Sequence, residues 1–320
     1  MGVETSMRAL RQGSFGGPGD LALVEVPVPV AGYGEVLVRV EAAGVNFADV
    51  MQTRGTYDGG PVPPYVAGFE AAGVVVEVGE SVDPGLVGTR VVGAGSGAFA
   101  EFVVMAANGV ALVPEGWRAE QGLGMVLNWA TALAALKPLG RLRSGETVLV
   151  QAAAGGVGQA AVRMAKHYGA TVIGAASAAK HDVVRALGAD RVVEYGEVGG
   201  VRGVDLVLES VGGEGFEGSL AAARRVTGRV VVFGAAAGVA SVSNWELVFK
   251  HQVQVMGLHI GSMAREAPEV YADVLRELDV LRREGVYVPG EPTVYDLAEG
   301  PAVLAALEAG RTVGKLALRP

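Results

Sequence analysis

Residues 147–169 constrain the fold more than any other part of the chain, because they join an apolar run, a glycine-rich turn and a helical pattern without a gap. They read TVLVQAAAGGVGQAAVRMAKHYG, with Gly155, Gly156 and Gly158 in the turn. Such a turn lets backbone amides and the positive end of a helix dipole approach a pyrophosphate. It departs from G-x-G-x-x-G, since Ala153 stands at the first glycine. The segment predicts a dinucleotide-binding βαβ unit, although the turn alone would also suit any tight strand-to-helix junction.

A second strand is predicted at 170–176, and its end is where nicotinamide enzymes distinguish their two cofactors. An acidic residue there would bind the ribose 2′-hydroxyl of NAD. This chain has no carboxylate before Asp182 and places Ser177 and Lys180 at that point. A hydroxyl and an ammonium suit a 2′-phosphate, so the pattern favours NADPH. The alternative is that Lys180 and the basic residues after it only solvate one face of a helix.

Length and composition limit the classes of protein that the chain can belong to. Its 320 residues suggest two domains, each able to bury a core. A net charge of −8 argues against a nucleic-acid-binding surface. No apolar run approaches the ~20 residues that span a membrane, and the start MGVETSMRALRQ lacks the apolar core of a signal peptide. We therefore expect a cytoplasmic protein that binds neither nucleic acid nor membranes.

The chain has no cysteine, which excludes disulfides, thiolate zinc sites, cysteine nucleophiles and iron–sulfur clusters. The four histidines are scattered and form no H-E-x-x-H motif. We expect them to be surface or core residues; only His259, in the apolar run VQVMGLHIG, is kept as a weak candidate for the cofactor site. No metal ligand set is predicted.

The arrangement of elements predicts two kinds of domain. Residues 7–120 show short strand-like runs broken by glycine and proline, which is typical of a β-rich domain. After the glycine turn, apolar strands alternate with expected helices, which indicates a parallel sheet with crossovers. The expected boundaries are a catalytic β-rich domain at 1–125, completed by about 265–320, and a dinucleotide-binding domain at 126–264. Within them we expect helices at 219–226, 245–250 and 266–284, loops at 55–66 and 258–268, and a closing strand GKLALRP.

These features together resemble the medium-chain dehydrogenase/reductase superfamily over essentially the whole chain. Zinc alcohol dehydrogenases of that superfamily carry G-x-C-H-x-D and Gly-His-Glu strings, where this chain reads GVNFAD at 44–49 and GFE at 68–70. Asn46 replaces the cysteine, and Phe47 and Phe69 replace the histidines, so the zinc ligands are absent. AAGVNFAD, AAAGGVG and GRVVVFG together resemble the zinc-independent quinone oxidoreductase, or ζ-crystallin-like, family. The resemblance implies an α/β fold with a Rossmann-type, doubly wound parallel sheet domain and a β-rich GroES-like catalytic domain.

The resemblance also implies two catalytic candidates near the nicotinamide and the substrate. Asn46 can orient a water, the carboxamide or a substrate carbonyl, or it can be a turn asparagine. Tyr57 can donate a hydrogen bond to a developing enolate or quinol oxygen, or it can pack beside the turn at 59–61. Met51 stands where some quinone oxidoreductases have another tyrosine, which would make one wall of the pocket apolar.

The cofactor site implied by the resemblance extends over several strand ends. Thr131 is expected near the nicotinamide, and Lys180 and Tyr195 around the 2′-phosphate; the alternatives are a helical threonine bonded to its own backbone and a tyrosine that closes the third strand. The positions at 212 and 233–235 fall where dinucleotides lie beyond the carboxyl ends of strands, or are ordinary turns. The full expected cofactor set is Asn46, Thr131, Ala154, Gly155, Gly156, Val157, Gly158, Ser177, Lys180, Tyr195, Gly212, Phe233, Gly234, Ala235 and Leu258.

The expected activity is hydride transfer from the reduced nicotinamide, for which the protein supplies geometry and exclusion of water. An electron-poor quinone or enone accepts hydride without the activation that zinc gives a ketone. We predict an NADPH:quinone oxidoreductase that needs no zinc. The alternatives are an NADPH-dependent reductase of α,β-unsaturated carbonyls and a non-catalytic, crystallin-like NADPH-binding protein. Glu70 is expected to be tied to an arginine or a backbone group, and the apolar strand near 253–260 to form a homodimer edge.

Overall fold

The computed structural model describes residues 5–320. Residues 1–4 begin the segment for which we expect no signal peptide, and they lie outside the described part. The described chain forms two compact units: the residues up to Leu127 together with Pro289–Pro320, and Asn128–Val288. The main difference from the expected boundaries is at 265–288. These residues belong to the second unit because α8 (Pro268–Arg283) packs on α3 (Ala130–Ala134) and α7 (Ile260–Glu266) of that unit.

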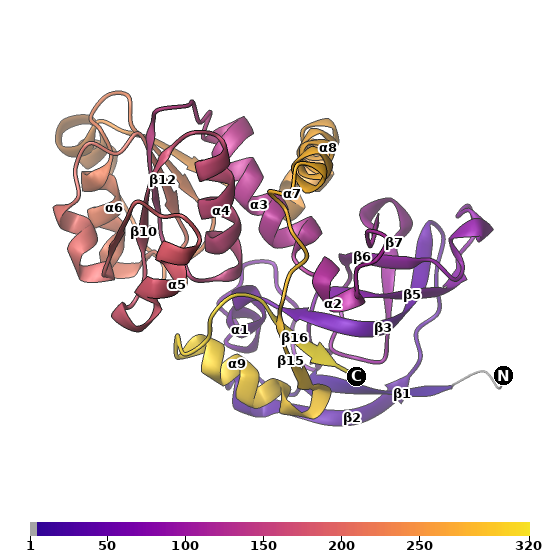
Figure 1. Ribbon diagram of the computed structural model, residues 1–320. Coiled ribbons are helices and arrows are strands. Elements are labelled where there is room, and N and C mark those ends of the chain that lie inside the picture. The colour runs from indigo at the N-terminus through magenta and orange to yellow at the C-terminus, as the bar shows by residue number, and fades with distance from the viewer. Residues whose placement is uncertain (1–4) are drawn as a thin grey trace. The chain divides into compact units, whose positions relative to one another are not determined.

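The second unit, all of whose residues are described, is built on one parallel sheet. The strand order of this sheet is β11-β10-β9-β12-β13-β14. The middle residues of its central strands are apolar and buried because helices cover both faces, with α4 and α6 on opposite sides (Figure 1). This confirms the Rossmann-type, doubly wound sheet. The strands are β9 (Thr147–Val150), β10 (Thr171–Ala175), β11 (Arg191–Val193), β12 (Leu206–Glu209), β13 (Arg229–Val232) and β14 (Gln254–Gly257), and the remaining helices are α4 (Gly156–His167), α5 (His181–Ala186) and α6 (Phe216–Ala222).

Several element boundaries in this unit differ from those expected. The helix expected at 219–226 ends at Ala222, because Ala223 forms a bridge to Val204 instead. The helix expected at 266–284 is found as α8, which begins at Pro268 because Ala267 leaves the helical region and proline suits the first turn of a helix. The prediction of a loop at 258–268 was wrong, because most of this segment forms α7.

The first unit is β-rich, which confirms the GroES-like domain. Among its described residues, a large sheet has the order β15-β16-β3-β5-β6-β8, with β7 also paired to β3, and a smaller sheet has the order β2-β1-β4. The strands are β1 (Ser6–Gln12), β2 (Leu21–Pro27), β3 (Glu35–Val45), β4 (Tyr65–Val66), β5 (Glu70–Val78), β6 (Arg90–Ala94), β7 (Phe102–Ala106), β8 (Ala111–Leu112), β15 (Thr293–Asp296) and β16 (Leu316–Arg319), and the helices are α1 (Phe47–Thr53), α2 (Ala119–Gly122) and α9 (Gly300–Glu308).

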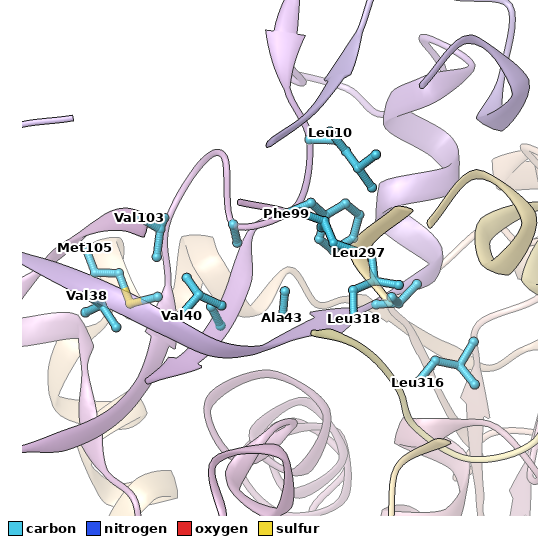
Figure 2. Close-up of a cluster of buried hydrophobic side chains, with 14 of the residues drawn as sticks. Leu10, Val38, Val40, Ala43, Phe99, Val103, Met105, Leu297, Leu316 and Leu318 are labelled. Atoms are coloured by element: carbon cyan, nitrogen blue, oxygen red, sulfur yellow. The ribbon is translucent and has the colours of Figure 1, made fainter. Parts of the chain in front are cut away.

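The core of this unit joins the two ends of the chain (Figure 2). Strand β16 pairs antiparallel with β3, with Leu316 opposite Val45. Leu316 and Leu318 are buried in the same hydrophobic cluster as Phe99 and Leu10, and each buried leucine contributes roughly 1.5–3 kcal/mol. This packing fixes the register of β16 and so places the residue before it, Lys315, at the end of β3.

None of the helices in residues 5–320 is both long enough and apolar enough to pass through a bilayer.

Candidate functional site

The glycine turn of the second unit leads from β9 into α4 as expected. Gly155 is the residue before the helix, and α4 begins at Gly156. A Cβ on Gly158 would lie 2.2 Å from the carbonyl oxygen of Ala152 and 2.6 Å from Cα of Ala153. Gly158 is therefore required for the close packing of α4 on the turn, which is the role of the last glycine in dinucleotide-binding turns.

The start of α4 fits a pyrophosphate. Within the described chain, no side chain caps this end of the helix and its first turn carries no acidic residue. Lys166 and His167 lie in the last turn, where cations complement the dipole. The unpaired amides of the first turn and the positive dipole end are thus directed at the space beyond β9.

The other expected cofactor residues of this unit follow the carboxyl ends of the parallel strands. The Ala153 amide donates to the carbonyl of Ala175 at 3.0 Å, so the glycine turn lies beside the end of β10. On the other side of β9, the Phe233 amide donates to Glu209 at 2.9 Å and the Leu258 amide to Val232 at 2.8 Å. Because the strands are parallel, their carboxyl ends meet at one edge of the sheet. The residues that follow these ends are Ala154, Gly155, Gly156, Val157, Gly158, Ser177, Lys180, Tyr195, Gly212, Phe233, Gly234, Ala235 and Leu258.

Two glycines on this edge leave no space for a side chain. A Cβ on Gly212, whose φ is +68°, would lie 2.4 Å from the carbonyl oxygen of Gly238. A Cβ on Gly234 would lie 2.7 Å from the carbonyl oxygen of Ser210. The turns after β12 and β13 therefore pack backbone against backbone at these two positions.

A buried carboxylate holds one of these turns in place, and sequence reasoning missed it. Glu209 ends β12 and is fully buried; its Oε1 accepts from the amides of Val211 at 2.7 Å and Gly212 at 2.9 Å. Its Oε2 accepts from the Ser219 hydroxyl. The signal was a glutamate that directly follows the apolar run LVL at 206–208.

The end of β10 carries the groups expected around a 2′-phosphate. Ser177 and Lys180 enclose one turn, in which the Lys180 amide donates to the Ser177 carbonyl at 2.8 Å. Partial burial lowers the pKa of Lys180. The first carboxylate after the strand, Asp182, forms an ion pair with Arg185 at 2.7 Å and is directed to solvent. Tyr195 follows β11 and is 42% exposed.

Two other candidate residues of the second unit, His259 and Thr131, lie in or next to helices. The Nδ1 of His259 accepts from the Ser262 amide at 3.0 Å and so caps α7. His259 is thus explained as a helix cap. Thr131 is buried within α3.

In the first unit, Asn46 lies in a cluster with Glu70 and Lys315. Its Nδ2 donates to Glu70 Oε2 at 2.9 Å and to the Gly44 carbonyl at 3.2 Å, and its Oδ1 accepts from Lys315 Nζ at 2.8 Å. Glu70 Oε1 accepts from the Gly124 amide at 2.5 Å. Glu70 is therefore tied to a backbone group, as expected, and to a lysine rather than an arginine.

A second carboxyl group, that of Asp49, contacts the backbone of Asn46. It is 1% exposed, and its Oδ2 accepts from the Asn46 amide at 2.7 Å. Its Oδ1 is buried with no hydrogen-bond partner among the described residues. Burial is the main cause that raises the pKa of Asp49 to about 8. Sequence reasoning did not select Asp49, whose signal was the acid inside GVNFAD.

Tyr57 lines a cavity of about 300 Å³ in the first unit. Its walls include Phe15, Gln52 and the turn at 58–61. Tyr57 itself opens that turn, since the Gly60 amide donates to its carbonyl at 3.0 Å. One wall of the pocket is formed by Gln52 of α1, the helix that also carries Met51.

No group of three or more histidine, cysteine, aspartate or glutamate side chains in residues 5–320 is placed to hold a metal ion. The positions that correspond to zinc ligands carry Asn46, Phe47 and Phe69, whose side chains are poor ligands for that ion.

Comparison with known proteins locates both units in one family. The model "Alcohol dehydrogenase GroES-like domain" matches residues 32–115, and the model "Zinc-binding dehydrogenase" matches residues 156–279. The chain is 32% identical to the synaptic vesicle membrane protein VAT-1 homolog of Rattus norvegicus, over 98% of this chain and 84% of that protein.

Two solved structures are similar along their whole length. One is the Escherichia coli quinone oxidoreductase complexed with NADPH, at 29% identity and a TM-score of 0.88, covering 98% of this chain and 100% of that one. The other is the CurK enoyl reductase, at 25% identity and a TM-score of 0.87, covering 99% of each chain. The chain thus belongs to the medium-chain dehydrogenase/reductase superfamily, as a nicotinamide-dependent oxidoreductase of its zinc-independent, quinone-oxidoreductase-like branch.

Proposed function

We propose that the protein is an NADPH-dependent, zinc-independent reductase that transfers hydride to quinones. The observation that carries the proposal is the set of residues found in the first unit at the positions of the zinc ligands. Where the zinc branch has cysteine and histidine, this chain has an asparagine held by Lys315 and Glu70 and two phenylalanines. This chemistry suits an acceptor that is already electron-poor, because such a molecule needs orientation more than activation by a Lewis acid.

The proposed cofactor contacts follow from the edge of the sheet. The amides at 155–158 and the start of α4 would bind the pyrophosphate, and Ser177, Lys180 and Tyr195 the 2′-phosphate. Thr131, Asn46, Leu258 and the turns at Gly212 and 233–235 would bind the nicotinamide half. Bound NADPH supplies the hydride. Tyr57 would hold the acceptor by a hydrogen bond from its hydroxyl to the oxygen that gains negative charge, and a proton from solvent completes the quinol.

The test is steady-state oxidation of NADPH and NADH with a panel of ortho-quinones, para-quinones, enones and plain aldehydes. We expect turnover of quinones with preference for NADPH. Turnover of aldehydes but not quinones would contradict the proposal, and so would a preference for NADH.

Reduction of α,β-unsaturated carbonyls is the second candidate. It is favoured by the likeness to an enoyl reductase and by Met51, an apolar residue where some quinone oxidoreductases have a tyrosine. The panel separates the two, because enones would then turn over faster than quinones. Tight binding of NADPH without turnover of any acceptor would instead favour a non-catalytic role.

A further inference from the structure

Lys315 places a positive charge inside the first unit. Its side chain is 12% exposed, and its ammonium group donates to Glu70 Oε2 at 2.5 Å, to Asn46 Oδ1 at 2.8 Å and to the Val45 carbonyl at 3.3 Å. These acceptors account for the three hydrogens of an ammonium group. Glu70 is fully buried, so the two charges neutralise each other away from solvent.

This ion pair determines which way the Asn46 amide faces. An ammonium group only donates hydrogen bonds, so the amide oxygen must face Lys315. A carboxylate only accepts, so the amide nitrogen must face Glu70. Reversing the amide would place nitrogen against nitrogen and oxygen against oxygen. One orientation of Asn46 is therefore strongly favoured.

The backbone around the cluster is adapted to it. A Cβ on Gly44 would lie 2.3 Å from Glu70 Oε2 and 3.1 Å from Cε of Lys315, so only glycine leaves room for the pair. Lys315 directly precedes β16, whose Leu316 lies opposite Val45. The buried leucines of β16 fix that register (Figure 2). The position of Lys315 next to Glu70 and Asn46 is therefore set by the pairing of β16 with β3.

We propose that Lys315 is a positioning residue of the reductase site, which acts by fixing the Asn46 amide with its oxygen toward the ammonium group and its nitrogen toward Glu70. The inference deepens the proposed function and rests on it for its kinetic test only. Without the ammonium group, the Asn46 oxygen loses its donor and the carboxylate of Glu70 is left buried beside the amide. No cation then requires the oxygen to face its side of the cluster, so the amide can rotate.

The kinetic test separates positioning from folding by means of three variants: Lys315→Met, Glu70→Gln and the double variant. Each single variant should lose stability, because it leaves a buried polar or charged group unpaired, and the double variant should recover part of that loss. We expect kcat with quinone in the double variant to stay on the order of tenfold below wild type, with KM within about twofold, because the amide is no longer held. Recovery of kcat together with stability would overturn the proposal.

A second readout does not depend on activity. The side-chain amide of Asn46 gives a pair of 15N-correlated signals in the cofactor-free protein, identified by their loss in Asn46→Ala. We expect these signals to move and to exchange faster with solvent in Lys315→Met and in the double variant. Arg90→Met is the matched control, since it removes a cation paired at 2.7 Å with Glu41 on the surface of the same unit, and it should leave the signals in place.

The two readouts distinguish the failure of one proposal from the failure of the other. If the wild-type protein turns over no acceptor, the proposed function fails, and the amide signals decide the role of Lys315 alone. Unchanged signals in Lys315→Met would show that the lysine does not hold Asn46.

Discussion

Ser177 and Lys180 follow β10, at the point where an acidic residue would select NAD. Their effect depends on local chemistry, because burial already lowers the pKa of Lys180 and a phosphate nearby would favour its charged form. Asp182 does not oppose this, since it is paired with Arg185. At the scale of the residue, we therefore expect the choice of cofactor to depend on these two side chains.

Replacing Lys180 with alanine should weaken the binding of NADPH more than that of NADH. A charge-assisted hydrogen bond contributes roughly 1.5–3 kcal/mol, so we expect about a tenfold or larger rise in Kd for NADPH. Titration of each cofactor by protein fluorescence measures both values. Lys166→Ala is the control, because Lys166 pairs with Asp190 at 2.8 Å on the surface of the same unit. An equal loss of affinity for NADPH and NADH would remove the argument for NADPH.

Asp49 should make the stability of the protein depend on pH. Its pKa in the folded protein is about 8, above the value of about 3.9 expected in the unfolded chain, so the folded state holds a proton that the unfolded state releases between these values. The contribution of Asp49 to stability is thus greatest below pH 4 and is lost as the pH rises toward 8, by up to about 1.4 kcal/mol per pH unit.

The variant Asp49→Asn keeps an oxygen for the Asn46 amide and removes this titration. Urea unfolding at several pH values should therefore show the variant gaining stability relative to wild type as the pH rises from 5 to 8. Parallel curves for the two proteins would mean that Asp49 titrates normally in the folded state.

At the scale of the element, the segment from β9 to α4 could be predicted because its signal is local. An apolar strand, a glycine turn and a helical pattern lie within 147–169, and the structure places them as expected. The end of α6 could not be predicted, because it depends on the bridge between Ala223 and Val204, which lies in another part of the chain. The same reason hid Lys315, which is 269 residues from Asn46 and meets it only through the pairing of β16 with β3.

Gly158→Ala should disturb α4 as a whole element. Its Cβ would press on the backbone of Ala152 and Ala153, which cannot move aside as a flexible side chain would. We expect a loss of roughly 1–3 kcal/mol in the free energy of unfolding, by analogy with overpacked cores, and weaker binding of either cofactor. Calorimetry and cofactor titration measure these two effects. Gly200→Ala is the control, because no atom lies within 4 Å of its added Cβ, and a variant pair with equal stability and affinity would contradict the assigned role of Gly158.

At the scale of the whole molecule, each compact unit is made from its own combination of chain segments. The first unit needs both ends of the chain, because β16 completes the sheet around β3. The second unit is continuous from Asn128 to Val288, and its sheet ends at β14. The two edge strands of that sheet differ, since β14 follows a π-helical turn, Glu246–His251, whose Val248 and Phe249 are exposed together with the preceding Trp245. An edge strand beside exposed apolar side chains favours association.

We predict that β14 pairs with its copy in a second molecule, so that two sheets continue into one across a twofold axis. Val255 lies in the middle of β14 and is 37% exposed. Val255→Lys should place a charge on the edge and convert a dimer into a monomer, because two copies of that lysine would lie close to the same axis. Val280→Lys is a matched control, since Val280 is also 37% exposed but belongs to α8. Sedimentation equilibrium at micromolar concentration decides the matter: a monomeric wild-type protein, or a Val255→Lys variant that remains dimeric, would contradict pairing through β14.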